Sequence, residues 1–158
     1  MNHSVKTGFS FGLTSAIITT SGLMVGLNSG THSRLVVIGG ILIIAVADSF
    51  SDSLGIHISE ESENIHTHKE IWLSTISTFS AKFIFTMTFL IPVIFLQLTE
   101  AILVSIIWGL SLLSIISYKM AKERKIKPWG VIFEHLITAL IVLIATNFIG
   151  GWISSMFK

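Results

Sequence analysis

Two aspartates stand in the middle of an otherwise apolar stretch of the sequence. Asp48 and Asp52 are four residues apart, so in a helix both carboxylates lie on one face, one turn apart. Together with Ser51 they offer hard oxygen ligands, which divalent cations prefer. Protons compete for the same oxygens. The pair therefore has the chemistry that an exchange of metal ions for protons requires.

A segment rich in histidine and glutamate follows the aspartates. It places three histidines and four glutamates within fourteen residues, and His57 and Glu61 are one turn apart if the helix continues. Imidazole and carboxylate groups bind Fe²⁺, Mn²⁺ or Zn²⁺, whereas the absence of cysteine excludes a closed thiolate zinc site. The segment is either a solvated acidic connection or a metal-capture site. Its candidate ligands are His57, Glu60, Glu61, Glu63, His66 and His68.

The composition indicates whether these residues belong to a soluble protein or to a membrane protein. Of 158 residues, 51% are hydrophobic and 12% are charged, against about 25% charged residues in a typical soluble domain. The mean hydropathy is +0.81. With no cysteine and a net charge of +1, the chain is neither a disulfide-rich secreted protein nor a strongly basic nucleic-acid binder. We expect an integral membrane protein that has the lipid bilayer as a partner and binds no nucleic acid.

Five apolar segments are long enough to cross a bilayer as helices, because a hydrocarbon core of about 30 Å requires roughly 20 apolar residues. They predict an all-α integral membrane protein with a single five-helix transmembrane domain over residues 1–158. Pro92 should kink or interrupt the third helix. Gly22 and Gly26 permit close helix packing and could support dimerisation. The predicted helices cover residues 9–27, 35–58, 71–98, 101–118 and 136–157.

The two aspartates are costly inside the second segment. Each costs about 2.5 to 3.5 kcal/mol at the centre of a membrane helix, so their face should be buried in protein or water. Two interpretations stay open. The aspartates can form a structural ion pair with Lys82 of the third segment, whose depth is close to that of Asp48, or they can form a cation site. In the second case Lys82 is the counter-charge that holds one Asp ionised while the other titrates.

The basic residues predict the orientation of the chain. Seven fall in connections on one side of the predicted membrane, and two, Arg34 and Lys158, fall on the other. By the positive-inside rule the N-terminus is cytosolic and the C-terminus is outside or luminal. Trp72 and Trp129 then lie at the cytosolic boundary and Trp152 near the opposite one. Anionic lipid contact is a second role for the basic cluster. The seven residues are Lys6, Lys69, Lys119, Lys122, Arg124, Lys125 and Lys127.

Glycines and other small residues recur along the chain in a loose pattern. The stretches that carry it are Phe11–Ser15, Gly22–Gly26, Gly40–Ser51, Gly55–Ser59, Trp72–Pro92 and Asn147–Ile153. Over nearly the whole chain this pattern resembles the vacuolar iron transporter family. The resemblance implies a five-helix protomer, a homodimer, and export of Fe²⁺ or Mn²⁺ from the cytosol in exchange for protons.

The chain departs from the family pattern at several positions. Phe11 stands where members usually carry an Asp, Asp52 where they carry a Met, and Ile56-His57 where they carry Glu-Tyr. The long Glu-rich cytosolic domain of plant and fungal members is reduced to the short Glu/His segment. The resemblance therefore implies a divergent, minimal member in which Asp48 and Asp52 replace the missing ligands.

These features predict a transporter rather than an enzyme. We expect a homodimeric multi-pass protein, in the cell membrane of a prokaryote or otherwise in a vacuolar-type membrane, with no permanently bound cofactor. Its cargo is Fe²⁺ or Mn²⁺, with Zn²⁺ as a further candidate. An intramembrane aspartyl enzyme does not fit, because both aspartates lie on one helix. The alternative is a non-transporting membrane module for metal sensing or protein assembly.

Overall fold

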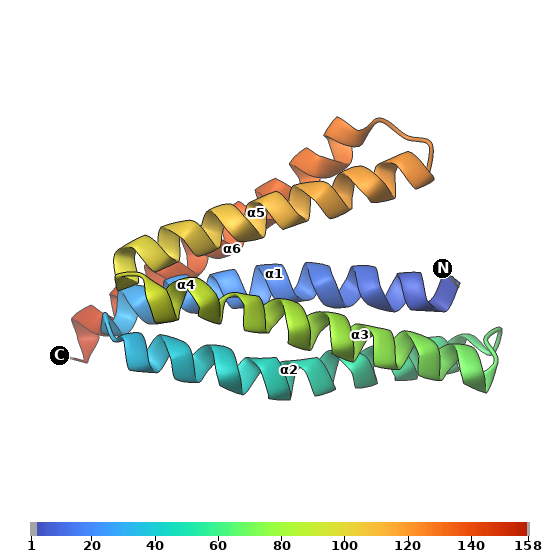
Figure 1. Ribbon diagram of the computed structural model, residues 1–158, viewed down its shortest axis with the longest axis horizontal. Coiled ribbons are helices and arrows are strands. Elements are labelled where there is room, and N and C mark those ends of the chain that lie inside the picture. Colours follow the sequence, from blue (N-terminus) through green and yellow to red (C-terminus); the bar gives the residue numbers. More distant parts are fainter. Residues whose placement is uncertain (1–2, 158) are drawn as a thin grey trace.

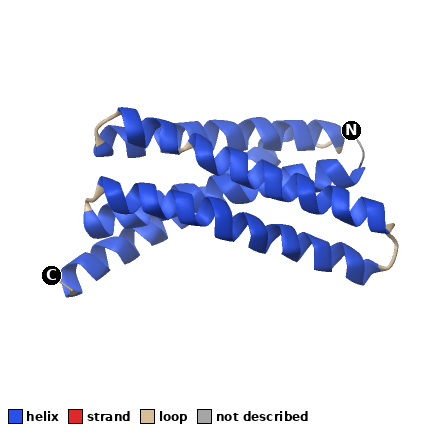
Figure 2. Cartoon of the chain, turned by 60° about the horizontal axis from the view of Figure 1, so that its bottom comes forward, coloured by secondary structure: helices blue, strands red, loops and turns tan. Residues whose placement is uncertain are grey.

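The computed structural model describes residues 3–157, and all secondary structure in that range is helical (Figure 2). Five of its segments are long and apolar enough to cross a membrane, because α4 continues α3 as one segment. The all-α fold with five potential spans is thus confirmed for this range and is compatible with a multi-pass membrane protein. The helices are α1 (His3–Thr31), α2 (Arg34–Glu63), α3 (His68–Thr88), α4 (Leu90–Phe95), α5 (Leu98–Glu123) and α6 (Pro128–Met156).

Most helices extend beyond the apolar runs that predicted them. The clearest case is α2, which we expected to end at residue 58 and which continues to Glu63, where Asn64 takes a left-handed conformation (φ 54°). At the start of α3, the Thr67 side chain and Glu70 form a reciprocal capping box. A charged residue ends an apolar run but does not end a helix, because helix ends are set by caps.

The third predicted helix is interrupted, as Pro92 predicted. α3 ends at Thr88 and α4 begins at Leu90. Pro92 has no N–H to donate to the Thr88 carbonyl one turn earlier. At the junction the Phe89 N–H instead donates to the Thr86 carbonyl at 3.1 Å, which gives a tighter turn.

α1 is the central helix, with α2 and α3 on one side and α5 and α6 on the other (Figure 1). Half of its most apolar stretch is buried, against 17% for α6. Glycines allow this position: a Cβ at Gly12 would clash with the Thr78 carbonyl of α3, and one at Gly150 would clash with the Gly26 carbonyl of α1. Gly22 and Gly26 therefore pack against α6 within the chain, so the dimer role that we considered for them is wrong.

The bundle is apolar on the outside and carries polar groups inside. Large side chains such as Ile43, Ile144 and Phe148 are 67%, 69% and 74% exposed, whereas Lys82 and several Ser and Thr side chains are buried. A water-soluble protein of this size does not expose so much apolar area, so this surface suits contact with lipid.

The basic residues of the described chain other than Lys82 lie at the two opposite ends of the bundle. The start of α1 and the α2–α3 and α5–α6 connections lie at one end of the bundle, and the α1–α2 and α4–α5 connections lie at the other (Figure 1). The seven basic residues assigned to the cytosolic side share the first end, and Arg34 lies at the second. Lys158 is outside the described residues. The orientation across a membrane remains a prediction.

Candidate functional site

The structure brings Lys82 together with both aspartates. Lys82 Nζ lies 2.5 Å from Asp48 Oδ2 and 2.5 Å from Asp52 Oδ2. It also donates to Ser15 Oγ at 2.8 Å. An ammonium group has three N–H donors, so these three acceptors can satisfy it completely. We call Ser15, Asp48, Asp52 and Lys82 the Asp–Lys–Asp cluster.

Three helices build the cluster. α2 supplies the aspartates from successive turns, α3 supplies Lys82, and α1 supplies Ser15. The Lys82 side chain is 1% exposed, whereas those of Asp48 and Asp52 are 31% and 19% exposed. The carboxylates therefore lie at the edge of the bundle, with the ammonium behind them. The ammonium occupies the space between the two carboxylates.

A row of hydroxyls follows α3 on either side of the cluster. Ser74, Thr78, Lys82 and Thr86 recur every four residues, and all four are buried. Thr20 Oγ1 on α1 lies 3.3 Å from Thr86 Oγ1. This period-four pattern is visible in the sequence, but the predicted site did not include its hydroxyl groups. It marks the polar face of α3 that packs against α1 and α2.

Glu60 is not part of an exposed loop, contrary to our expectation. It lies in α2, is 7% exposed, and its Oε2 atom is 2.5 Å from Ser74 Oγ of α3. Because α2 continues to Glu63, Glu60 is carried into the α2–α3 interface instead of the Glu/His segment. It therefore extends the polar row toward the end of the bundle that holds the N-terminus.

Ser51 and His57 lie on another face of α2. Both line an open apolar cavity of about 660 Å³ between α2 and α3, with Trp72 and Phe79 among its walls. His57 Nδ1 is 3.0 Å from Thr75 Oγ1, and its ring meets the Trp72 ring edge-on at 4.9 Å. Ser51 does not join the hydrogen bonds of the Asp–Lys–Asp cluster, so its predicted place beside the aspartates is not reproduced.

The remaining predicted ligands do not converge on one point. His66 Nε2 lies 3.2 Å from Glu63 Oε2, while Glu61 is exposed and the His68 ring packs 6.3 Å from the Trp72 ring. Within residues 3–157, no three His, Asp or Glu side chains are close enough to hold one metal ion. The structure therefore does not gather the Glu/His segment into a metal-capture site, and that site remains a prediction.

The sequence interpretation missed Ser15. It is one of several Ser and Thr residues in the first apolar segment, and no spacing rule distinguishes it from the others. Its position opposite Lys82 depends on the register between α1 and α3. Three buried hydroxyls, those of Ser21, Ser49 and Ser105, have no hydrogen-bond partner within the described residues. They add further polar groups to the interior of the bundle.

Comparisons of the chain with protein-family models, curated proteins and solved structures found no match. The resemblance to the vacuolar iron transporter family therefore remains a prediction from the sequence, and the function is inferred from the cluster.

Proposed function

We propose that this protein is a membrane transporter that exports a divalent cation, Fe²⁺ or Mn²⁺, from the cytosol in exchange for protons. The observation that carries the proposal is the Lys82 ammonium held between two carboxylates inside a bundle with an apolar surface. Buried ionisable groups are expensive in a membrane and are concentrated at ion pathways. We place the exchange at the Asp–Lys–Asp cluster.

The chemistry of exchange follows from charge. Asp48 and Asp52 carry two negative charges when ionised, and Lys82 carries one positive charge. A divalent cation that takes the place of the ammonium neutralises both carboxylates, provided that the Lys82 side chain moves aside. Binding of the cation and protonation of the cluster are therefore alternatives, and this competition couples the two ions.

The exposed edges of the carboxylates support a homodimer as part of the same proposal. Asp48 and Asp52 are partly exposed on α2 in a single chain. Charged oxygens that face lipid are unfavourable, so a surface that covers α2 would lower this cost. A second copy packed on α2 would bring two clusters near one another. The path for the ion would then run beside α1 and α2 of both protomers.

A specific observation favours the alternative, a non-transporting module for metal sensing or assembly. Every donor of Lys82 already has an acceptor within the chain. In that alternative the cluster has a purely structural role and holds α1, α2 and α3 together. The two functions differ in one measurable property, the flux of a metal ion.

Proteoliposomes under a pH gradient test the proposal. Entry of Fe²⁺, Mn²⁺ or Zn²⁺ is followed with a metal-sensitive dye, and proton movement with a pH dye. We expect Fe²⁺ or Mn²⁺ flux coupled to opposite proton movement, lost in both Asp48→Asn and Asp52→Asn. Glu100→Gln is the matched control, because it also neutralises a carboxylate, on an exposed residue at the start of α5.

The results separate the two functions. Saturable binding of metal without flux would support the sensing module, and neither binding nor flux would support assembly alone. Flux that is equal in wild type and Asp52→Asn would refute the cluster as the exchange site. Folding of each variant is checked by size-exclusion profile and helical content, so that a loss of flux is not a loss of protein.

A further inference from the structure

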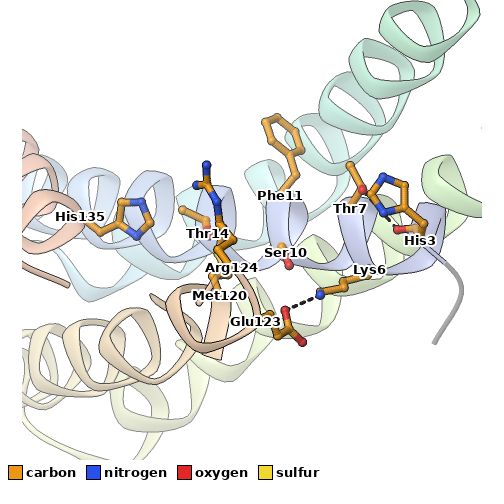
Figure 3. A pocket seen from close by; sticks show the side chains of 10 residues that line it. All are labelled: His3, Lys6, Thr7, Ser10, Phe11, Thr14, Met120, Glu123, Arg124 and His135. Atoms are coloured by element: carbon orange, nitrogen blue, oxygen red, sulfur yellow. Dashed lines mark hydrogen bonds and ion pairs between the residues drawn. The ribbon is translucent and has the colours of Figure 1, made fainter. Parts of the chain in front are cut away.

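A second polar site lies on the other side of α1. A pocket of about 500 Å³ opens between α1, α5 and α6 at the end of the bundle that holds the N-terminus (Figure 3). None of the residues in the Asp–Lys–Asp cluster lines it. Its walls combine basic groups, hydroxyls and apolar side chains: His3, Lys6, Thr7, Ser10, Phe11, Thr14, Met120, Glu123, Arg124 and His135.

Some of the charged side chains that line this pocket have a partner within the described residues, and one does not. Lys6 of α1 pairs with Glu123 of α5 across one part of it, and Figure 3 shows the Arg124 guanidinium in another part. Within residues 3–157 the Arg124 side chain makes no hydrogen bond or ion pair, and His135 bonds to Ser117. The pocket thus presents a guanidinium with free donors, whose planar geometry suits two oxygens of a phosphate group.

The backbone fixes Arg124 at this place. At the end of α5 the Ile126 N–H donates to the Ala121 carbonyl at 3.0 Å, and the Lys125 N–H donates to the Lys122 carbonyl at 3.1 Å. Lys125 is left-handed, with φ 56°. This is the Schellman arrangement, which closes a helix in a defined turn. Arg124 is its capping residue, so these main-chain bonds fix the backbone from which its side chain reaches the pocket.

The surroundings are those of a membrane boundary. Trp129, the second residue of α6, is 70% exposed, and the Lys122 ammonium lies 5.2 Å from the centroid of the Tyr118 ring. Aromatic and basic residues of this kind gather where hydrocarbon meets headgroups. Phe11, 43% exposed, and Met120 give the same pocket an apolar wall. A ligand that fits has an anionic phosphate at one end and an apolar chain at the other.

We infer that this pocket binds the headgroup of an anionic phospholipid, with Arg124 on its phosphate and Phe11 against the first part of an acyl chain. Basic pockets between membrane helices bind such headgroups. The inference is independent of metal transport, because it uses none of the residues in the Asp–Lys–Asp cluster. It gives the basic end of α5 a specific role beyond the positive-inside signal.

Lipid retention tests the inference. The purified protein is loaded with phosphatidylglycerol or phosphatidylcholine in detergent, and the bound lipid is counted by native mass spectrometry as free lipid is diluted. We expect wild type to retain phosphatidylglycerol in preference to phosphatidylcholine. Arg124→Gln should weaken that retention at least about tenfold, because it removes charge-assisted hydrogen bonds to the phosphate.

Lys127→Gln is the matched control. It removes the same charge from the same connection, but Lys127 is exposed and does not line the pocket. Retention close to that of wild type in this variant supports a defined site, whereas an equal loss in both variants would mean diffuse surface attraction and overturn the inference. Equal retention of both lipids in wild type would overturn it as well. Competition by soluble glycerol phosphate as strong as that by the lipid would assign the pocket to a free phosphate ester instead.

Discussion

A buried cation on one side of α1 is fully paired, whereas an exposed cation on the other side has no ionic partner within the described residues. Toward α2 and α3, Lys82 is 1% exposed, and each of its donors has an oxygen within 2.8 Å. Toward α5 and α6, Arg124 is exposed at an open pocket and has no ionic partner in the described chain. A buried ammonium requires pairing because its desolvation is costly, while water or headgroups can satisfy an exposed guanidinium.

Packing differs along with charge. Gly8 and Gly12 let the backbone of α1 approach that of α3 closely, so these two helices are in direct contact beside the Asp–Lys–Asp cluster. On the opposite side α5 and α6 diverge from α1 toward the N-terminal end, where the pocket opens (Figure 1). We therefore expect the α1–α3 side to determine stability and the α5–α6 side to accept a ligand.

Removing the charge of Lys82 should have the largest effect. Lys82→Met leaves two carboxylates without their partner and should destabilise the fold by about 3 to 5 kcal/mol. The measurement is reversible unfolding of the purified protein in detergent, followed by circular dichroism. Arg124→Gln, on the other side of α1, should leave the stability nearly unchanged.

A compensated variant distinguishes charge from packing at the same place. Lys82→Met combined with Asp48→Asn and Asp52→Asn removes all three charges and should recover most of the lost stability. If Lys82→Met alone unfolds at the same denaturant concentration as wild type, the ammonium is not held as described, and the contrast between the two sides of α1 fails.

Adding a side chain to α1 tests the packing difference. Gly12→Leu places atoms against the Thr78 carbonyl and should cost about 1 to 3 kcal/mol or more, because backbone cannot move aside easily. Ser10→Leu adds a similar side chain two residues earlier, where α1 lines the pocket, and should change stability by about 0.5 kcal/mol or less. Equal costs in the two variants would show that both sides of α1 are equally tight.

Ser15 should make a smaller contribution to the stability of the α1–α3 contact. Ser15→Ala leaves one Lys82 donor without its acceptor, at a cost of about 1 to 2 kcal/mol in the free energy of unfolding. Ser15→Thr keeps the hydroxyl and should retain most of the stability. An alanine variant as stable as wild type would mean that two carboxylates alone satisfy the ammonium.

The sequence predicts part of the cluster because its members are exceptions to their surroundings. Asp48, Asp52 and Lys82 are charged residues in apolar runs, and their similar depth in neighbouring helices indicates contact. Ser15 could not be predicted, because its partner depends on how far α1 slides along α3. That register is set by the contacts of Gly8 and Gly12 with α3, which are not visible in a single sequence.

The expected metal ligands show a second limit of sequence reasoning. The last apolar residue suggested a helix end near Ile58, so Glu60 and Glu61 were expected in the connection that follows this helix. The helix instead continues to Glu63, and successive residues of a helix point about 100° apart. Glu60 is therefore buried against Ser74 while Glu61 is exposed. The capping box at Thr67 and Glu70 was the signal that could have placed the start of α3 correctly.

The Lys6–Glu123 pair is expected to contribute less than the contacts of Lys82, and it gives the sharpest comparison with them. Both are Lys–carboxylate pairs between helices, but the Lys6 and Glu123 side chains are 39% and 51% exposed. Water screens such a pair, so Lys6→Gln should cost at most about 1 kcal/mol, and the cost should shrink as salt is added. A double-mutant cycle with Glu123→Gln measures the pair itself. A coupling free energy above about 2 kcal/mol that does not change with salt would mean that this exposed pair joins α1 to α5 as strongly as Lys82 joins α1, α2 and α3.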